Sequence, residues 1–212
     1  MVQFSIVDPG KCREAYQWHR GFAASNDCIF PRSWESYEQL ADEGRVWCAQ
    51  NDRGDFVALA YFDFDNSRWE IGGLMVATQE RRKGIGSIIA RLTLGHILFE
   101  EDPLGRGETI IAHVHAENLE PRSTIANVLR FRQSKHIKLP GALLPGLRTN
   151  IAGEIEGDEF ETVRPDSLLA LSQWCNTWDG KLKDGREVKV LLSPGTSLNL
   201  WAKAFREMAS RF

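Results

Sequence analysis

The chain has 212 residues, a length that suits one domain with additions. Its hydrophobic fraction of 42% is ordinary for a globular protein, and its net charge of -3 argues against a general nucleic-acid binder, which is usually strongly basic. It contains no run of about 18 apolar residues, so we expect no membrane-spanning helix.

The amino-terminal part of the chain predicts one strand, two helices and three more strands. Apolar and polar residues alternate after Met1, which is typical of a strand. Ser33 is a good N-cap for the second helix, and the turn residues Asn51 to Asp55 predict a hairpin. The expected ranges are a strand at Val2 to Val7, helices at Lys11 to Ala24 and Trp34 to Glu43, and strands at Arg45 to Gln50, Phe56 to Phe64 and Arg68 to Val76.

Two glycines, Gly72 and Gly73, lie inside the last of these strands. Glycine in a strand interior often marks a bulge or the close approach of another backbone. We therefore expect the strand to be irregular at this point.

The remainder of the chain predicts further helices and strands. The apolar stretch after Gly84 has the periodicity of a buried helix. Pro140 to Gly146 is rich in Pro and Gly and indicates a boundary. The expected helices are Ile85 to Phe99, Arg122 to Gln133, Pro165 to Trp174 and a final helix capped by Thr196 or Ser197; the expected strands are Thr109 to His115, Lys135 to Leu139, Glu159 to Val163 and Arg186 to Leu192; a loop is expected at Glu100 to Gly107.

The turn between Val76 and the buried helix has the chemistry of an anion site. Its sequence is Arg81-Arg82-Lys83-Gly84-Ile85-Gly86-Ser87. The first N–H groups of a helix have no intrahelical acceptor and lie at the positive end of the helix dipole. Glycine lets a phosphate approach the backbone, and three cations precede it here. The spacing fits neither a Rossmann fingerprint nor a Walker A loop, and a basic turn without ligand is the alternative.

In this context, Arg81-x-x-Gly84-x-Gly86 after a strand ending in Val76 resembles motif A of the Gcn5-related N-acetyltransferases, the GNAT superfamily. The resemblance implies an α+β fold, with a central mixed, mostly antiparallel, twisted sheet flanked by helices. It also implies acetyl-CoA or another acyl-CoA as co-substrate. The five histidines of the chain are scattered, so we expect no metal site. The residues that the resemblance places at this cofactor are Leu74, Met75, Val76, Arg81, Arg82, Lys83, Gly84, Ile85, Gly86, Ser87 and Asn118. For Asn118, a turn-forming role is an equal alternative.

The same resemblance suggests direct transfer of an acetyl group to a primary amine, for which a carboxylate base is needed. Glu70 in the fourth strand is the candidate base, and a surface ion pair is its alternative role. The tyrosine that the family uses to protonate the thiolate is missing after the fifth strand. Ser123 or water takes its place, unless the thiolate needs no acid.

The predicted function is therefore an acyl-CoA-dependent N-acyltransferase with a small-molecule or peptide amine as acceptor. Two alternatives are a non-catalytic acyl-CoA-binding or interaction module, favoured by the missing tyrosine, and a relative that modifies a nucleic-acid base. A basic cluster would serve the latter, but the acidic isoelectric point makes nucleic acid unlikely. Its members are Arg122, Arg130, Arg132, Lys135 and Lys138.

The organisation and location follow from the same features. Residues 1–140 are expected to form the acyl-CoA-binding core. Residues 141–212 are expected to pack on it, completing the sheet, the acceptor side or a homodimer interface. The amino terminus lacks the pattern of a secretory signal, and the four cysteines are widely spaced, so we expect a cytoplasmic protein with reduced thiols.

Overall fold

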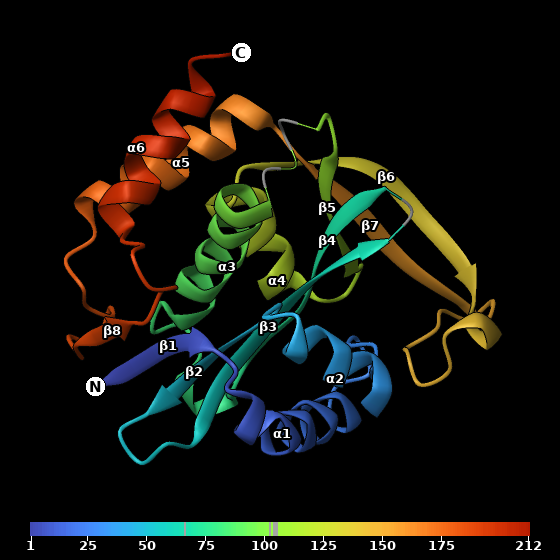
Figure 1. The fold of residues 1–212 in the computed structure, drawn as a ribbon. Coiled ribbons are helices and arrows are strands. Elements are labelled where there is room, and N and C mark those ends of the chain that lie inside the picture. The colour runs from blue at the N-terminus through green and yellow to red at the C-terminus, as the bar shows by residue number, and fades with distance from the viewer. Residues whose placement is uncertain (66, 102, 104–105) are drawn as a thin grey trace.

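A single eight-stranded sheet runs through the protein in a computed structural model that describes residues 1–65, 67–101, 103 and 106–212 (Figure 1). The strand order is β6-β7-β5-β4-β3-β2-β1-β8. The pairs β4–β5 and β1–β8 are parallel, and the other neighbours are antiparallel. The mixed, mostly antiparallel sheet expected from the sequence is therefore confirmed.

The amino-terminal elements occur in the predicted order. Ser33 caps the second helix, since its side chain accepts a hydrogen bond from the backbone N–H of Ser36. The elements are β1 Val2–Ile6, α1 Cys12–Ala24, α2 Trp34–Asp42, β2 Val46–Asn51, β3 Phe56–Asp65 and β4 Arg68–Val76. Asn66, in the turn expected between β3 and β4, lies outside the described residues, as does part of the loop expected at Glu100 to Gly107.

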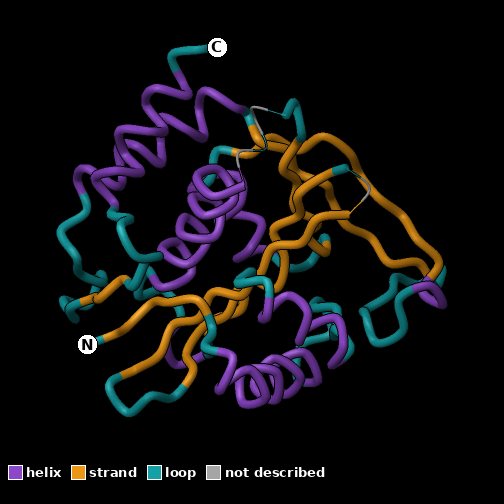
Figure 2. The backbone as a smooth tube through the Cα atoms, in the orientation of Figure 1, coloured by secondary structure: helices purple, strands orange, loops and turns teal. Residues whose placement is uncertain are grey.

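Helices cover both faces of the sheet (Figure 2). On one face, α1 and α2 enclose a core that includes Tyr37, Leu59 and Met75. On the other face, the long helix α3 Ile85–His96 packs with α5 Arg164–Thr177 and α6 Leu198–Ala209 over a larger core. Burial of apolar surface on both faces supplies the main driving force for this three-layer arrangement.

Residues after Pro140 contribute to the same sheet and the same core. Strand β7 Glu154–Thr162 lies between β5 Thr109–His115 and β6 Phe131–Pro140. The short strand β8 Val188–Val190 pairs with β1 at the opposite edge. Leu168, Trp201 and Phe205 are each no more than 1% exposed in the core over α3.

The helix predicted at Arg122 to Gln133 is wrong at its carboxyl end. Helix α4 Leu119–Ser123 continues as a wider helical turn only to Val128. Arg130 then adopts a left-handed conformation with φ of 61°, and Phe131 begins β6. The side chain of Phe131 is 4% exposed, and its backbone pairs with Thr162 of β7. This sheet pairing overrides the helical periodicity of the segment.

Strands β4 and β5 form a fork. They pair only from Arg68↔Thr109 to Glu70↔Ile111, and no pairing follows between the remaining residues of the two strands. Gly72 and Gly73 lie just beyond the last pair, where the register of β4 against β3 also shifts, so the expected irregularity is present. The facing edges of the two strands beyond Glu70 are therefore free to bind an extended ligand.

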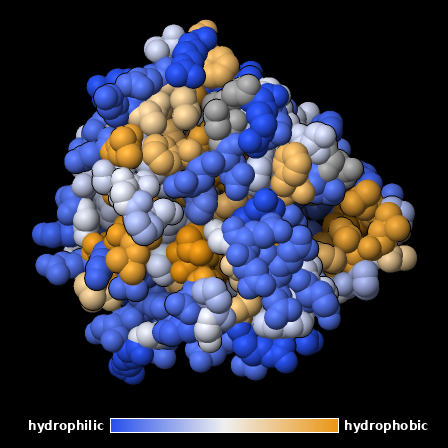
Figure 3. All heavy atoms as spheres, viewed as in Figure 1, coloured by the Kyte–Doolittle hydropathy of each residue, from blue (hydrophilic) through white to orange (hydrophobic). Residues whose placement is uncertain are grey.

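The loop between β6 and β7 folds back toward the α1–α2 loop. The Arg148 backbone N–H donates to the carbonyl of Asp27 over 2.7 Å, and its guanidinium pairs with the Asp27 carboxylate at 2.8 Å. Leu143 and Ile151 in the same loop are exposed, at 63% and 108%. Figure 3 shows hydrophobic side chains gathered at this end of the molecule.

Candidate functional site

The turn before α3 has a backbone suited to an anion. Strand β4 ends at Val76, a short helical turn follows at Thr78–Glu80, and α3 begins at Ile85. Arg82 and Gly84 both have left-handed backbones, with φ of 63° and 95°. Left-handed residues among right-handed ones form the nests that bind anions through successive N–H groups. Gly84 is suited to this conformation because it carries no Cβ.

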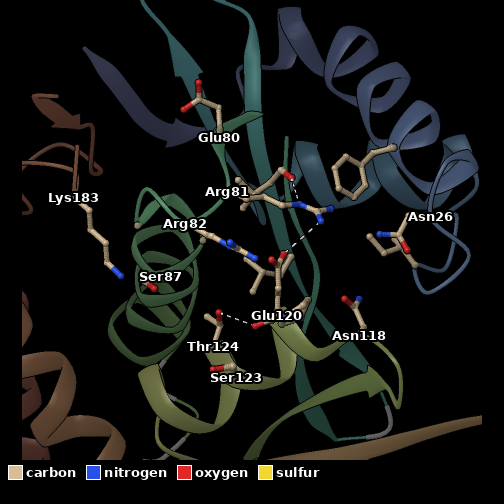
Figure 4. Close-up of a pocket in the computed structure, with 17 residues that line it drawn as sticks. Asn26, Glu80, Arg81, Arg82, Ser87, Asn118, Glu120, Ser123, Thr124 and Lys183 are labelled. Atoms are coloured by element: carbon tan, nitrogen blue, oxygen red, sulfur yellow. Dashed lines mark hydrogen bonds and ion pairs between the residues drawn. The ribbon is translucent and has the colours of Figure 1, made fainter. Parts of the chain in front are cut away.

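A cavity of about 420 Å³ lies against this turn (Figure 4). Its wall joins the turn to the carboxyl end of β4, to α4, and to the end of α1 with the loop that follows it. Lys183, which lies between α5 and β8, also lines it. The lining residues are Phe22, Asn26, Ile29, Leu74, Val76, Glu80, Arg81, Arg82, Gly84, Gly86, Ser87, Asn118, Glu120, Pro121, Ser123, Thr124 and Lys183.

The structure brings most of the sequence-predicted cofactor residues to this cavity. Those that line it are Leu74, Val76, Arg81, Arg82, Gly84, Gly86, Ser87 and Asn118, and the candidate acid Ser123 joins them. Met75 and Ile85 are each 1% exposed and do not line the cavity. Lys83 pairs with Glu80 at 3.4 Å and does not line the cavity, and neither does Glu70.

Some of the cationic side chains around the cavity form ion pairs with carboxylates, and others do not. Arg81 contacts Glu120 at 3.5 Å across the cavity, as Figure 4 shows. Glu80 is held by Lys83 and Arg186, which neutralise it. Within the described part of the chain, Arg82 and Lys183 form no ion pair. The residues present therefore fit a phosphate-bearing ligand, because they leave cationic side chains free beside a backbone anion site.

Tyr61 of β3 explains why β4 has glycines beside the fork. A Cβ built on Gly73 would lie 2.1 Å from Tyr61 Cε1, and one on Gly72 would lie 2.6 Å from Tyr61 Cε2. The tyrosine ring therefore occupies the space that larger side chains would need. The Arg32 guanidinium lies over the same ring, 4.3 Å from its centroid.

Glu70 belongs to a polar cluster at the base of the fork, on the face of the sheet that carries α1 and α2. His113 Nδ1 lies 3.0 Å from Glu70 Oε1, and His113 Nε2 lies 3.2 Å from Glu159 Oε2. Both imidazole nitrogens thus face carboxylates, which favours the doubly protonated ring. The hydrogen bond with Glu70, followed by the charges of Glu70 and Glu159, raises the pKa of His113 above 6.5 against the opposing effect of burial.

Glu159 anchors this cluster. Its side chain is 5% exposed, and burial alone would raise its pKa. Several donors outweigh that effect and lower the pKa to about 2. The donors are Ser134, Arg68, Lys135 and His113. Glu159 is therefore ionised at neutral pH and holds His113 in place for Glu70.

Several residues of the site are not among those predicted from the sequence. His113 lies within the strand expected at Thr109 to His115, but its two carboxylate partners come from β4 and β7, which are distant in sequence. Glu120 precedes the helix expected at Arg122 to Gln133, and Thr124 directly follows Ser123, so no helical spacing indicated them. Lys183 lies one hundred positions after Lys83 and had no local signal.

Neither a membrane span nor a metal site is found in the described residues. No helix among them has both the length and the apolar character needed to cross a bilayer. The described His, Cys, Asp and Glu residues form no group of three or more that could hold a metal ion.

Comparison with known proteins gives one family. Residues 13–121, just over half of the chain, match the acetyltransferase (GNAT) family. No curated protein matches the chain.

Solved structures match the fold at low sequence identity. The ribosomal-protein-S18-alanine N-acetyltransferase of Escherichia coli is 16% identical, with 76% of this chain and 93% of that chain covered and a TM-score of 0.52. A GNAT-family acetyltransferase from Streptococcus pneumoniae is 10% identical, covers 76% and 98%, and has a TM-score of 0.58. A candidate acetyltransferase from Salmonella typhimurium, solved with acetyl-CoA, is 11% identical, covers 76% and 92%, and has a TM-score of 0.56.

Proposed function

The chain belongs to the GNAT acetyltransferase family, and on that premise we propose that it transfers an acetyl group from acetyl-CoA directly to a primary amine. The observation that carries the proposal is that one cavity forms a path from the anion-binding turn at Arg82 and Gly84 to Leu74 and Val76, in the part of β4 that no longer pairs with β5. This path offers phosphate-binding N–H groups at one end and unpaired strand edges at the other. Acetyl-CoA has phosphates at one end and an amide-containing arm that leads to its thioester.

The acyl-CoA would lie with its pyrophosphate at the turn and its pantetheine arm along Leu74 and Val76. Asn118 and Ser123 line the opposite wall. The free backbone groups of β4 beyond Glu70 are suited to hydrogen-bond the two amides of the arm, as an added strand would. The oxygen that becomes negative in the tetrahedral intermediate would be stabilised by backbone N–H groups near the bulge.

Glu70 is proposed as the base, with His113 as its positioning residue. The acceptor arrives as an ammonium ion, because alkyl amines have pKa values near about 10. Glu70 takes one proton through water, and the neutral nitrogen attacks the thioester carbon. A C–N bond forms, the nitrogen gives up its second proton to water, the C–S bond breaks, and the CoA thiolate leaves. Glu70 lies at the last β4–β5 pair, next to the point where the strands part, and its carboxylate contacts His113.

The site allows three outcomes for the departing thiolate, which takes a proton from Ser123, takes one from water, or leaves unprotonated. Ser123 lines the cavity and accepts a hydrogen bond from Asn127 at 3.2 Å, so its own hydroxyl hydrogen is free to donate. In the second outcome, water supplies the proton. The third needs no acid at all, since a CoA thiolate is a tolerable leaving group.

The acceptor is proposed to be a peptide or small-molecule amine, met in the cytoplasm. The nucleic-acid alternative is disfavoured because members of the basic cluster are already paired: Arg122 with Asp158 at 2.6 Å, and Lys138 with Glu156 at 2.9 Å. The non-catalytic alternative keeps the cavity and dispenses with the cluster at Glu70. Measuring turnover distinguishes this non-catalytic alternative from the proposed acetyltransferase.

The test combines binding and turnover. We expect calorimetry to detect acetyl-CoA binding, and a folded Gly84→Trp variant to lose it, because the added ring blocks the anion site. CoA release against a panel of amines, peptides and nucleic acids should identify the acceptor class. Unchanged affinity in the folded variant contradicts the cofactor site, and binding without release for any acceptor favours the non-catalytic module.

The role of Glu70 is tested by its pH dependence. We expect Glu70→Gln to lower kcat by about 100-fold at neutral pH, within the usual range for general bases, with little change in acetyl-CoA affinity. The loss should shrink at high pH, where the acceptor amine is already neutral. A variant with the wild-type pH–rate profile would remove Glu70 from the mechanism.

A further inference from the structure

The segment between α5 and β8 is docked on the anion-binding turn. We call residues 179–187 the C-terminal turn. Its Lys183 backbone N–H donates to the carbonyl of Lys83 over 3.1 Å, and the Arg186 guanidinium pairs with Glu80. Leu182, directly before Lys183, is 5% exposed and belongs to the core over α3. The C-terminal turn is therefore fixed to the candidate site by backbone, charge and apolar contacts.

The C-terminal turn is also ordered internally. The Leu182 N–H donates to the Arg186 carbonyl at 2.9 Å, and the Gly185 N–H donates to the Leu182 carbonyl at 3.0 Å. The Arg186 side chain bonds Asp184 at 2.9 Å as well as Glu80. These bonds fix the backbone from which the Lys183 side chain projects.

The Lys183 side chain projects along the start of α3. Its Cγ lies 3.6 Å from where a Cβ would be on Gly84. Figure 4 shows the side chain running from the C-terminal turn toward Ser87 at the cavity wall. No ion pair is found for Lys183 among the described residues, whereas its neighbours Asp184 and Arg186 pair with each other. An unpaired ammonium is thus held beside the helix start that would receive phosphate.

We propose that Lys183 binds a phosphate group of the acyl-CoA substrate, so that the C-terminal turn completes the acyl-CoA site. This inference rests on the proposed function. The phosphate is either the pyrophosphate at the turn or the 3′-phosphate of the nucleotide, both of which present anionic oxygens to an ammonium. Glu80 is already neutralised by Lys83 and Arg186, which leaves Lys183 free for the ligand.

The test compares Lys183→Met with a matched variant, Lys181→Met. Lys181 is an exposed lysine of the same C-terminal turn that does not line the cavity. We expect calorimetry to show about 10-fold weaker CoA binding for Lys183→Met, the size of one charge-assisted hydrogen bond, and wild-type binding for Lys181→Met. Lys183→Arg should retain most of the affinity. Equal melting temperatures without ligand would confirm that the variants fold alike.

Titration with 3′-dephospho-CoA identifies the phosphate. If Lys183→Met weakens binding of CoA but not of dephospho-CoA, the 3′-phosphate is the partner; if it weakens both, the pyrophosphate is. Either result supports the proposal. Wild-type affinity of Lys183→Met for both ligands, or equal loss in Lys181→Met, overturns it while leaving the proposed function intact. If the wild-type protein binds no CoA, the proposed function itself fails.

Discussion

Arg81 meets a carboxylate inside the cavity that we assign to a phosphate ligand. Glu120 Oε2 lies 3.5 Å from its guanidinium, and both residues line the cavity. The two side chains are 36% and 56% exposed, so their attraction is weakened by solvent. A bound pyrophosphate would compete with Glu120 for Arg81 and would be repelled by the carboxylate.

We expect Glu120→Gln to strengthen CoA binding. The substitution removes a negative charge and releases Arg81, and exposed ion pairs of this kind contribute up to about 1 kcal/mol, so the Kd should fall roughly 2- to 5-fold. The hydrogen bond from Thr124 goes to the backbone carbonyl of Glu120 and is unaffected by the change. Calorimetric titration with CoA at two salt concentrations measures the effect, which should diminish at the higher one.

Glu207→Gln is the matched control. Glu207 is a 60% exposed residue of α6 that pairs with Lys203 at 3.9 Å and does not line the cavity. It changes the net charge by the same amount, so it should leave the Kd for CoA nearly unchanged. Weaker binding in Glu120→Gln, or the same response in both variants, would show that Glu120 does not oppose the ligand.

At the scale of elements, α6 packs closely on α3 where Trp201 lies against Gly95. A Cβ on Gly95 would lie 2.4 Å from Trp201 Cζ3, and Trp201 is 1% exposed. The glycine therefore makes room for the largest side chain of α6. The same helix carries Phe205, which is fully buried beside Trp201. Gly95 lies on α3, the helix whose first residues form the anion site.

Gly95→Ala is expected to destabilise the protein by about 1–3 kcal/mol. Overpacking forces the indole or the helix to move, and costs of this size are usual. Denaturation by urea measures the change in the free energy of unfolding. Gly21→Ala is the control, because Gly21 lies in α1 with nothing within 4 Å of its added Cβ. That variant should be slightly more stable, since alanine favours helix over glycine. Equal stability of both variants would rule out the steric role of Gly95.

At the scale of the whole molecule, the last third of the chain is built into the fold. We propose that residues 141–212 form one cooperative unit with the core. Strand β7 separates β5 from β6, and α5 and α6 cover the apolar face of α3. The C-terminal turn, which carries Lys183, lies between α5 and α6 in the chain. The acyl-CoA site and the fold would therefore depend on the same region.

Truncation after Pro140 should give an unstable or aggregating protein. The cut leaves β6 without its partner β7, opens the edge of β5 and exposes the core that Leu168, Trp201 and Phe205 fill. Open edges and large apolar patches promote aggregation. Size-exclusion chromatography and thermal melting followed by circular dichroism measure the outcome.

Truncation after Ala209 is the control for this experiment. It removes only residues beyond α6, all of them exposed, and should melt near the full-length protein. A soluble, monomeric product of the cut after Pro140 that still unfolds cooperatively would contradict the single unit.

Local signals in the sequence determined most of the framework. The N-cap at Ser33, the hairpin residues from Asn51 and the alternation in the strands act over a few positions, and they produced the predicted order up to β4. The turn from Arg81 to Ser87 was also readable, because its glycines, cations and flanking strand and helix are contiguous. Contiguous features of this kind need no knowledge of the tertiary structure.

Only the tertiary structure decided where distant residues meet. Phe131 leaves a helical pattern because β7 arrives to pair with it. His113 gains its two carboxylates from β4 and β7, and Lys183 reaches the start of α3 only because the C-terminal turn docks on Lys83. Each of these outcomes depends on contacts between segments far apart in the chain. No short-range pattern encodes such contacts, since they arise from the packing of complete elements on one sheet.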